Sequence, residues 1–157
     1  MIKINLVCVG KIKEQYFDLG VKEYVKRLDR YCDLSIIEVL EENYKKVDDG
    51  AIEVILQKEK ERILPHLKGF VIAMAIEGKK YSSKQFSNLI ESCAVQGNGT
   101  ITLVIGGSYG LAKQIKDKAN LLISFSDMTF PHTLFRLMAV EQIYRAFCIK
   151  DGVAYHK

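Results

Sequence analysis

The chain has 157 residues, 48% of them hydrophobic and 27% charged, and its formal net charge is +4. This composition excludes an extensively disordered protein, and a chain of this length can bury about 70% of its unfolded surface in one core, so we expect a single domain over residues 1–157. The longest apolar run, residues 70–76, is far shorter than the roughly 20 residues of a transmembrane helix, and the apolar start of the chain predicts a strand rather than a signal peptide.

Charge and cysteine content limit the function further. The net charge is too small to identify a nucleic-acid-binding protein by itself, although the basic excess lies in residues 101–157. Cys8, Cys32, Cys93 and Cys148 form no C-x-x-C pair, which argues against a zinc site and against a disulfide framework. We therefore expect a cytoplasmic protein without a structural metal, whose cysteines are small buried apolar side chains.

Strand and helix patterns alternate through the first half of the chain. Residues 2–9 are β-rich, and apolar residues at steps of three and four then predict a helix from about residue 14 to residue 28. A second strand is expected at 34–40. A charged helix follows at about 50–64, and a proline and a glycine mark its end.

The second half of the chain continues this alternation. Strands are expected at 70–76, 100–105 and 121–125, and helices at about 83–95, 111–118 and 133–150. Strands that alternate with helices at this spacing predict the α/β class, with a mostly parallel sheet flanked by helices.

Three loops follow strand ends and are the candidate ligand sites, because ligands of α/β folds bind beyond the carboxyl ends of the strands: residues 77–79, 106–110 and 126–131. The second loop contains adjacent glycines, Gly106 and Gly107, where the backbone can approach a nucleotide-like ligand closely. Its spacing fits neither the dinucleotide-binding G-x-G-x-x-G fingerprint nor a P-loop. A purely structural tight turn is the alternative interpretation.

The helix expected at 133–150 is apolar around most of its circumference. Such a helix is buried on all sides, which predicts contact with its own sheet on one side and with a second subunit on the other. We therefore predict a homodimer. Arg136, Glu141, Gln142 and Arg145 interrupt the apolar surface, and they form either an ordinary helix ion pair or a cationic wall that faces a substrate.

The chain ends in Tyr155, His156 and Lys157. These side chains provide an aromatic face for stacking, an imidazole that can accept a proton and an ammonium group that can contact an anion. A functional tail is one interpretation. A frayed terminus without a role is the other.

Four motifs occur together in a fixed order: L-V-I-G-G-S-Y-G at 103–110, F-S-D-M-T-F-P-H at 125–132, E-Q-I-Y-R-A at 141–146 and Y-H-K at 155–157. With them the chain resembles, over essentially its whole length, the RlmH family, the ribosomal large-subunit pseudouridine N3-methyltransferases of the SPOUT superfamily. The resemblance implies a trefoil knot in the C-terminal half, a homodimer and S-adenosylmethionine as the cofactor. It also implies that the methyl acceptor is a pseudouridine of 23S rRNA in the assembled ribosome.

The resemblance further implies which residues contact the cofactor. They are Met74, Gly106 and the loop residues Phe125, Ser126, Asp127, Met128, Thr129 and Phe130. The chain departs from the commonest family pattern at Met74, where leucine is frequent, and at Glu77. Methionine in place of leucine conserves apolar volume. Glu77 leaves the contacts of the loop at 77–79 open.

Methyl transfer to an imide nitrogen requires that donor and acceptor be aligned and that the N–H proton be removed. His156 is the candidate base or proton relay, and Tyr155 is expected to stack on the base. Contacts to phosphate or to the developing negative charge are expected from Arg136, Arg145, which pairs with Glu141, and Lys157. Two other functional classes stay open: a non-enzymatic domain that binds RNA or a nucleotide, and an α/β enzyme that acts on a small molecule.

Overall fold

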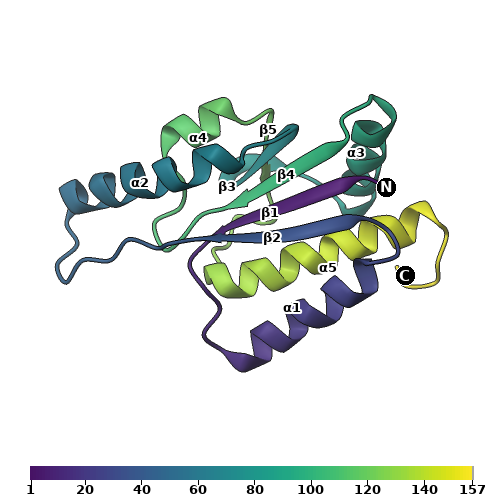
Figure 1. Ribbon diagram of the computed structural model, residues 1–157, viewed down its shortest axis with the longest axis horizontal. Helices are drawn as coiled ribbons and strands as arrows, with labels where there is room; N and C mark the ends of the chain where they lie inside the picture. The colour runs from purple at the N-terminus through teal and green to yellow at the C-terminus, as the bar shows by residue number, and fades with distance from the viewer. Residues whose placement is uncertain (157) are drawn as a thin grey trace.

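The computed structural model describes residues 1–156, which form a five-stranded sheet with helices on both faces (Figure 1). The strands are β1 (Lys3–Val9), β2 (Asp33–Val39), β3 (Phe70–Lys80), β4 (Thr100–Ile105) and β5 (Leu121–Ser124). Their order across the sheet is β2-β1-β4-β3-β5, and each of the pairings between these strands is parallel. The predicted α/β class is confirmed.

The helices lie between successive strands, except for α5, which follows the last strand. They are α1 (Gln15–Leu28), α2 (Asp49–Ile63), the short 3-10 helix η1 (Leu64–His66), α3 (Ser83–Val95), α4 (Lys113–Lys118) and α5 (His132–Lys150). Side chains fix two of the starts: the Asp48 carboxylate accepts a hydrogen bond from the Ala51 amide, and Ser82 with Gln85 forms a capping box at α3. Among the described residues, no helix is long and apolar enough to span a membrane.

Each face of the sheet has its own core, because alternate strand residues point to opposite sides. Leu6 and Leu103 belong to the core formed with α1, α3 and α5, whereas Val7 and Val104 belong to the core formed with α2 and α4. Helix α5 contacts both α1 and α3 (Figure 1), so helices of the same chain cover part of the apolar circumference for which the sequence predicted a second subunit. Full burial of each such side chain contributes about 1.5 to 3 kcal/mol.

The end of β3 differs from the prediction, which placed a loop at residues 77–79. The strand continues to Lys80, because Met74 and Lys79 both pair with Ile123 of β5. The residues between them bulge out of the sheet, and pairing then resumes. A bulge of this kind has no signature in the apolar pattern, since the polar residues after Ile76 have the composition of a loop.

Candidate active site

A cavity of about 410 Å³ opens at the carboxyl ends of β3, β4 and β5. This volume lies within the usual range of small-molecule sites, about 300 to 1,000 Å³. All three loops selected from the sequence contribute to its walls, because parallel strands end at the same edge of the sheet. The expected cofactor residues that line it are Met74, Gly106, Phe125, Ser126, Met128, Thr129 and Phe130.

The β3 bulge forms one wall of the cavity. Ala75, Ile76 and Glu77 face it, while Gly78 lies directly against β5. A Cβ atom on Gly78 would lie 2.7 Å from the backbone nitrogen of Ile123, a distance that real Cβ atoms do not adopt. Glycine is therefore required here, because it lets the bulge pack against the backbone of β5.

The glycine turn after β4 forms the opposite wall. The Gly110 amide donates to the carbonyl of Gly107 over 3.1 Å, and Gly110 has a φ of +81°. A Cβ atom on Gly106 would lie only 2.4 Å from the Gly110 carbonyl oxygen. The turn closes on itself this tightly because side chains are missing at both ends, and its backbone lines the cavity.

The loop between β5 and α5 completes the cavity. Ser126 organises it, since its carbonyl accepts from Ser124 Oγ over 2.9 Å and its hydroxyl accepts from the Met128 amide over 3.0 Å. Phe125 stacks on Phe135 of α5 with ring centroids 4.7 Å apart. Asp127, also expected to contact the cofactor, instead points away from the cavity and pairs with Lys80 over 2.6 Å.

Charge on the cavity wall is concentrated at one ion pair. Glu77 Oε1 lies 2.6 Å from Lys116 Nζ, and this contact holds the pKa of Glu77 below its usual range. Apart from this pair and His132, the lining residues are apolar or uncharged. Such a wall offers apolar surface and backbone polar groups to a nucleoside-like ligand. Within residues 1–156, no group of three or more His, Cys, Asp or Glu side chains could hold a metal ion.

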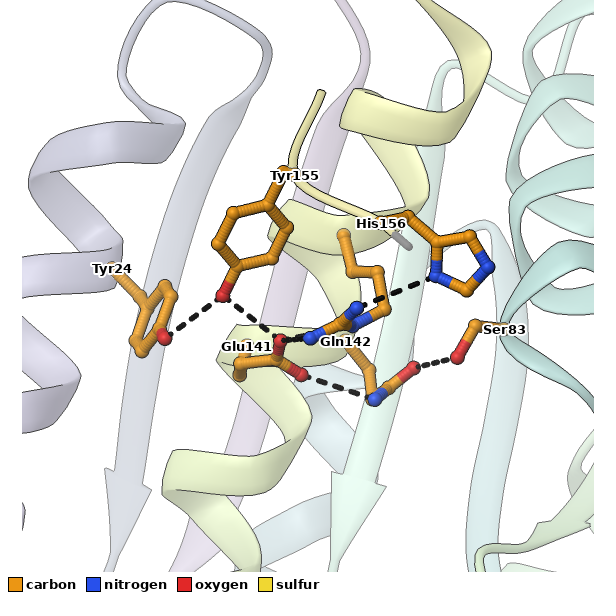
Figure 2. A network of polar contacts seen from close by, with 7 residues as sticks. Tyr24, Ser83, Glu141, Gln142, Tyr155 and His156 are labelled. Carbon is orange, nitrogen blue, oxygen red and sulfur yellow. Dashed lines mark hydrogen bonds and ion pairs between the residues drawn. The ribbon is translucent and has the colours of Figure 1, made fainter. Parts of the chain in front are cut away.

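A second group of expected site residues meets on α5, which we call the tail cluster: Glu141, Arg145, Tyr155 and His156 (Figure 2). Glu141 Oε1 accepts from Arg145 Nε over 2.9 Å and from the Tyr155 hydroxyl over 3.0 Å. The Arg145 guanidinium lies over the Tyr155 ring, 4.8 Å from its centroid, and Arg145 Nη1 lies 3.3 Å from His156 Nδ1. Tyr155 and His156 thus contact α5 through their side chains, in contrast to the frayed alternative.

The contacts of the tail cluster also shift the pKa values of Tyr155 and Arg145. Burial, followed by the hydrogen bonds to Tyr24 and Glu141, raises the pKa of Tyr155, so its phenol stays neutral at physiological pH. The hydrogen bond to Glu141 raises the pKa of Arg145. Tyr155 can consequently stack or donate a hydrogen bond, but it is not a base at neutral pH.

Arg136 does not join the tail cluster. Its guanidinium pairs with Glu38 over 2.6 Å and donates to the Gly10 carbonyl over 3.0 Å, and its side chain is only 4% exposed. Arg136 precedes Arg145 by nine residues, which at about 100° per residue places the two on opposite sides of α5. The cationic wall predicted from the sequence therefore lacks Arg136. Lys157 lies outside the described residues.

The cavity and the tail cluster lie apart in one chain. Glu141 follows His132 by nine residues, about 13 Å along α5. A second hollow of about 630 Å³ lies between them, on the face formed by α1, α3 and α5. Phe125 and Ile123 line both hollows, and half-buried Leu137 and Met138 line the second.

Sequence reasoning missed two partners of the tail cluster. The Tyr24 hydroxyl lies 3.0 Å from that of Tyr155, and Ser83 Oγ donates to Gln142 Oε1 over 2.7 Å (Figure 2). In the sequence, Tyr24 belongs to the helix expected at about 14–28, and Ser83 to the start of the helix expected at about 83–95. No local spacing reports a contact with a residue so far away in the sequence.

Comparisons with known proteins agree with this geometry. A family model described as predicted SPOUT methyltransferase matches residues 2–156. A protein from Clostridium botulinum named ribosomal RNA large subunit methyltransferase H is 49% identical over 161 residues, which cover 99% of this chain and 100% of that protein. A protein of the same name from Streptococcus equi subsp. zooepidemicus is 50% identical over 159 residues, with the same two coverages. The structure of a probable methylase family protein from Haemophilus influenzae is similar in fold, with a TM-score of 0.54, 13% identity and coverage of 99% of this chain and 70% of that one.

Proposed function

The chain belongs to the SPOUT methyltransferases and, within them, to the RlmH family, and we propose that it transfers the methyl group of S-adenosylmethionine to N3 of a pseudouridine in 23S rRNA of the assembled ribosome. The observation that carries the proposal is the match to this family over the full length of both chains. The cavity at the sheet edge supports it, since two of the four motif segments, residues 103–110 and 125–132, contribute to its walls.

The composition of the cavity suits S-adenosylmethionine. Met74, Ile105 and Phe125 provide apolar surface for its nucleoside, and the backbone of residues 106–110 and 125–130 provides donors and acceptors. The cofactor supplies an electrophilic methyl group on its sulfonium. The contribution of the chain is to hold donor and acceptor in line and to exclude water between them.

Removal of the acceptor's imide proton is assigned to the tail. His156 accepts or relays the proton, and Arg145, held by Glu141, stabilises the negative charge that develops on the base. Tyr155 stacks or donates a hydrogen bond, in keeping with its raised pKa. Lys157 is proposed to contact phosphate. Arg136 is left out, because Glu38 and the Gly10 carbonyl already use its guanidinium.

We propose in addition that the protein is a homodimer. One chain's tail cluster lies about 13 Å along α5 from the end of the helix that borders its cavity, a separation that a tail from a second copy would bridge. The half-buried apolar residues Leu134, Leu137 and Met138 supply a face for that copy. One domain over residues 1–157, a C-terminal trefoil knot and a cytoplasmic location, where ribosomes are found, belong to the same proposal.

The decisive experiment incubates the protein with labelled S-adenosylmethionine and ribosomes that lack this methylation, and then maps the labelled base. We expect label at one pseudouridine of 23S rRNA, and none on ribosomes that already carry the methyl group. Stoichiometric cofactor binding without transfer would favour a non-enzymatic binding domain. Methylation of an isolated metabolite with no label in ribosomes would favour a small-molecule enzyme, and either result would contradict the proposal.

A further inference from the structure

The segment at residues 78–84, G-K-K-Y-S-S-K, carries three exposed lysines and no acidic residue. We call Lys79, Lys80 and Lys84 the lysine strip. Other segments after strands at this edge of the sheet are less basic: residues 10–14 hold two lysines and one glutamate, residues 41–49 hold four acidic residues against two lysines, residues 106–112 hold no charge, and residues 125–131 hold one aspartate. Positive charge on this edge is therefore concentrated beside β3.

The contacts of the lysine strip leave its charge available to a ligand. Lys79 Nζ lies over the Tyr81 ring, 5.3 Å from its centroid, and within residues 1–156 neither Lys79 nor Lys84 has a carboxylate within 4.0 Å. Lys80 pairs with Asp127, but both side chains are largely exposed. An exposed pair of this kind is worth at most about 1 kcal/mol, so a phosphate can compete for the lysine.

The position of the strip connects the two parts of the proposed site. Ala75, Ile76 and Glu77, just before the strip, line the cavity, whereas Tyr81 and Ser83 line the second hollow. Ser83 donates to Gln142, and Gln142 Nε2 donates to Glu141 Oε2 over 3.0 Å, which joins the segment to the tail cluster (Figure 2). A strand of nucleic acid that runs along the strip would pass beside the cavity, at its boundary with the second hollow.

We propose that the lysine strip binds the phosphate backbone of the RNA that presents the target base. This inference rests on the proposed function, which it extends to the surface that holds the substrate. Each neutralised phosphate needs its own cation, and counterions are released as each contact forms. Three lysines on one short segment can therefore hold two or three successive phosphates while the base between them enters the cavity.

The test compares two double variants that each lower the formal net charge from +4 to +2. Lys79→Gln with Lys84→Gln removes charge from the strip. Lys3→Gln with Lys68→Gln is the control, because both lysines are exposed, have no carboxylate within 4.0 Å among residues 1–156, and lie at the opposite edge of the sheet. Binding to assembled ribosomes is measured by sedimentation over a series of salt concentrations, without cofactor. Cofactor affinity and thermal unfolding are measured on the same proteins.

We expect the strip variant to bind about tenfold more weakly at roughly 0.1 M salt, and its slope of log affinity against log salt to fall by about 2, one unit per phosphate contact. The control should keep the wild-type slope, and both should keep wild-type cofactor affinity. The proposal that the strip binds phosphate would be overturned by an unchanged salt slope, whether or not binding is weaker. It would also be overturned if the control variant lost as much affinity as the strip variant. If the strip variant loses binding as expected but the wild-type protein transfers no methyl group, the proposed function is contradicted, whereas phosphate binding by the strip is supported. If the wild-type protein transfers it and the variant binds normally, the strip alone fails.

Discussion

Replacing Gly78 by alanine perturbs the wall of the cavity at a position that has no room for a side chain. The new Cβ atom would lie 2.7 Å from both the Ile123 nitrogen and the Leu122 carbonyl carbon, and 2.8 Å from the Ile123 carbonyl carbon. Ordinary contact begins at 3.4 Å, and backbone atoms inside a sheet cannot rotate away. The bulge must therefore move by about 0.7 Å, at a cost of about 1 to 3 kcal/mol.

That displacement should be seen in two measurements. The melting temperature should fall by roughly 5 °C for a chain of this size, and the Kd for S-adenosylmethionine in calorimetry should rise at least about tenfold, which corresponds to 1.4 kcal/mol. Gly99→Ala is the matched control, since a Cβ atom there meets nothing within 4 Å and should change stability by less than about 0.5 kcal/mol. Wild-type cofactor affinity in a folded Gly78→Ala protein would refute the role of the bulge as a cavity wall.

Three further predictions concern the tail, a buried ion pair and a buried carboxyl. Deletion of residues 155–157 should abolish methyl transfer to ribosomes and leave cofactor affinity unchanged in calorimetry; retained turnover would contradict a catalytic tail. Arg136→Ala should destabilise the fold by about 1 to 3 kcal/mol in urea unfolding, because Glu38 and the Gly10 carbonyl lose the hydrogen bonds of its buried guanidinium, whereas Lys22→Ala, in an exposed helix pair, should cost less than about 0.5 kcal/mol. Burial raises the pKa of Glu59 above its ordinary 4.5, so the folded state binds this proton more tightly and stability falls as pH rises from 4.5 through the folded pKa. Glu59→Gln should remove that part of the pH dependence, and an unchanged unfolding profile between about pH 4 and 8 would contradict it.

Much of the fold follows from local patterns. The strand at residues 100–105 and the parallel alternation were predictable, because apolar runs and helical spacings report which side of an element is buried. The family identified from the four motifs is confirmed by the match to residues 2–156. The continuation of β3 to Lys80 was not predictable, since only its pairing with Ile123 and Ser124 makes those residues a strand.

The candidate site, like the fold, has features that the sequence predicts and features that it does not. The convergence of the three loops followed from the parallel sheet alone, and the structure brings Gly106 and Phe125 to one cavity. Asp127 was expected from the family resemblance and Arg136 from its place on the apolar helix, but each pairs with a charged residue of another element. Such partners are set by tertiary packing, and a single sequence carries no signal for them.

Phe125 has a consequence for regulation, because it lines both the cavity and the second hollow and stacks on Phe135 of α5. An occupant of either hollow that repositions this ring changes the wall of the other. Thermodynamic linkage makes such an effect reciprocal. If the cofactor changes the affinity for a partner on α5 by a given factor, that partner changes the affinity for the cofactor by the same factor. If both occupants reposition Phe125, this one aromatic side chain would make cofactor binding and assembly thermodynamically interdependent.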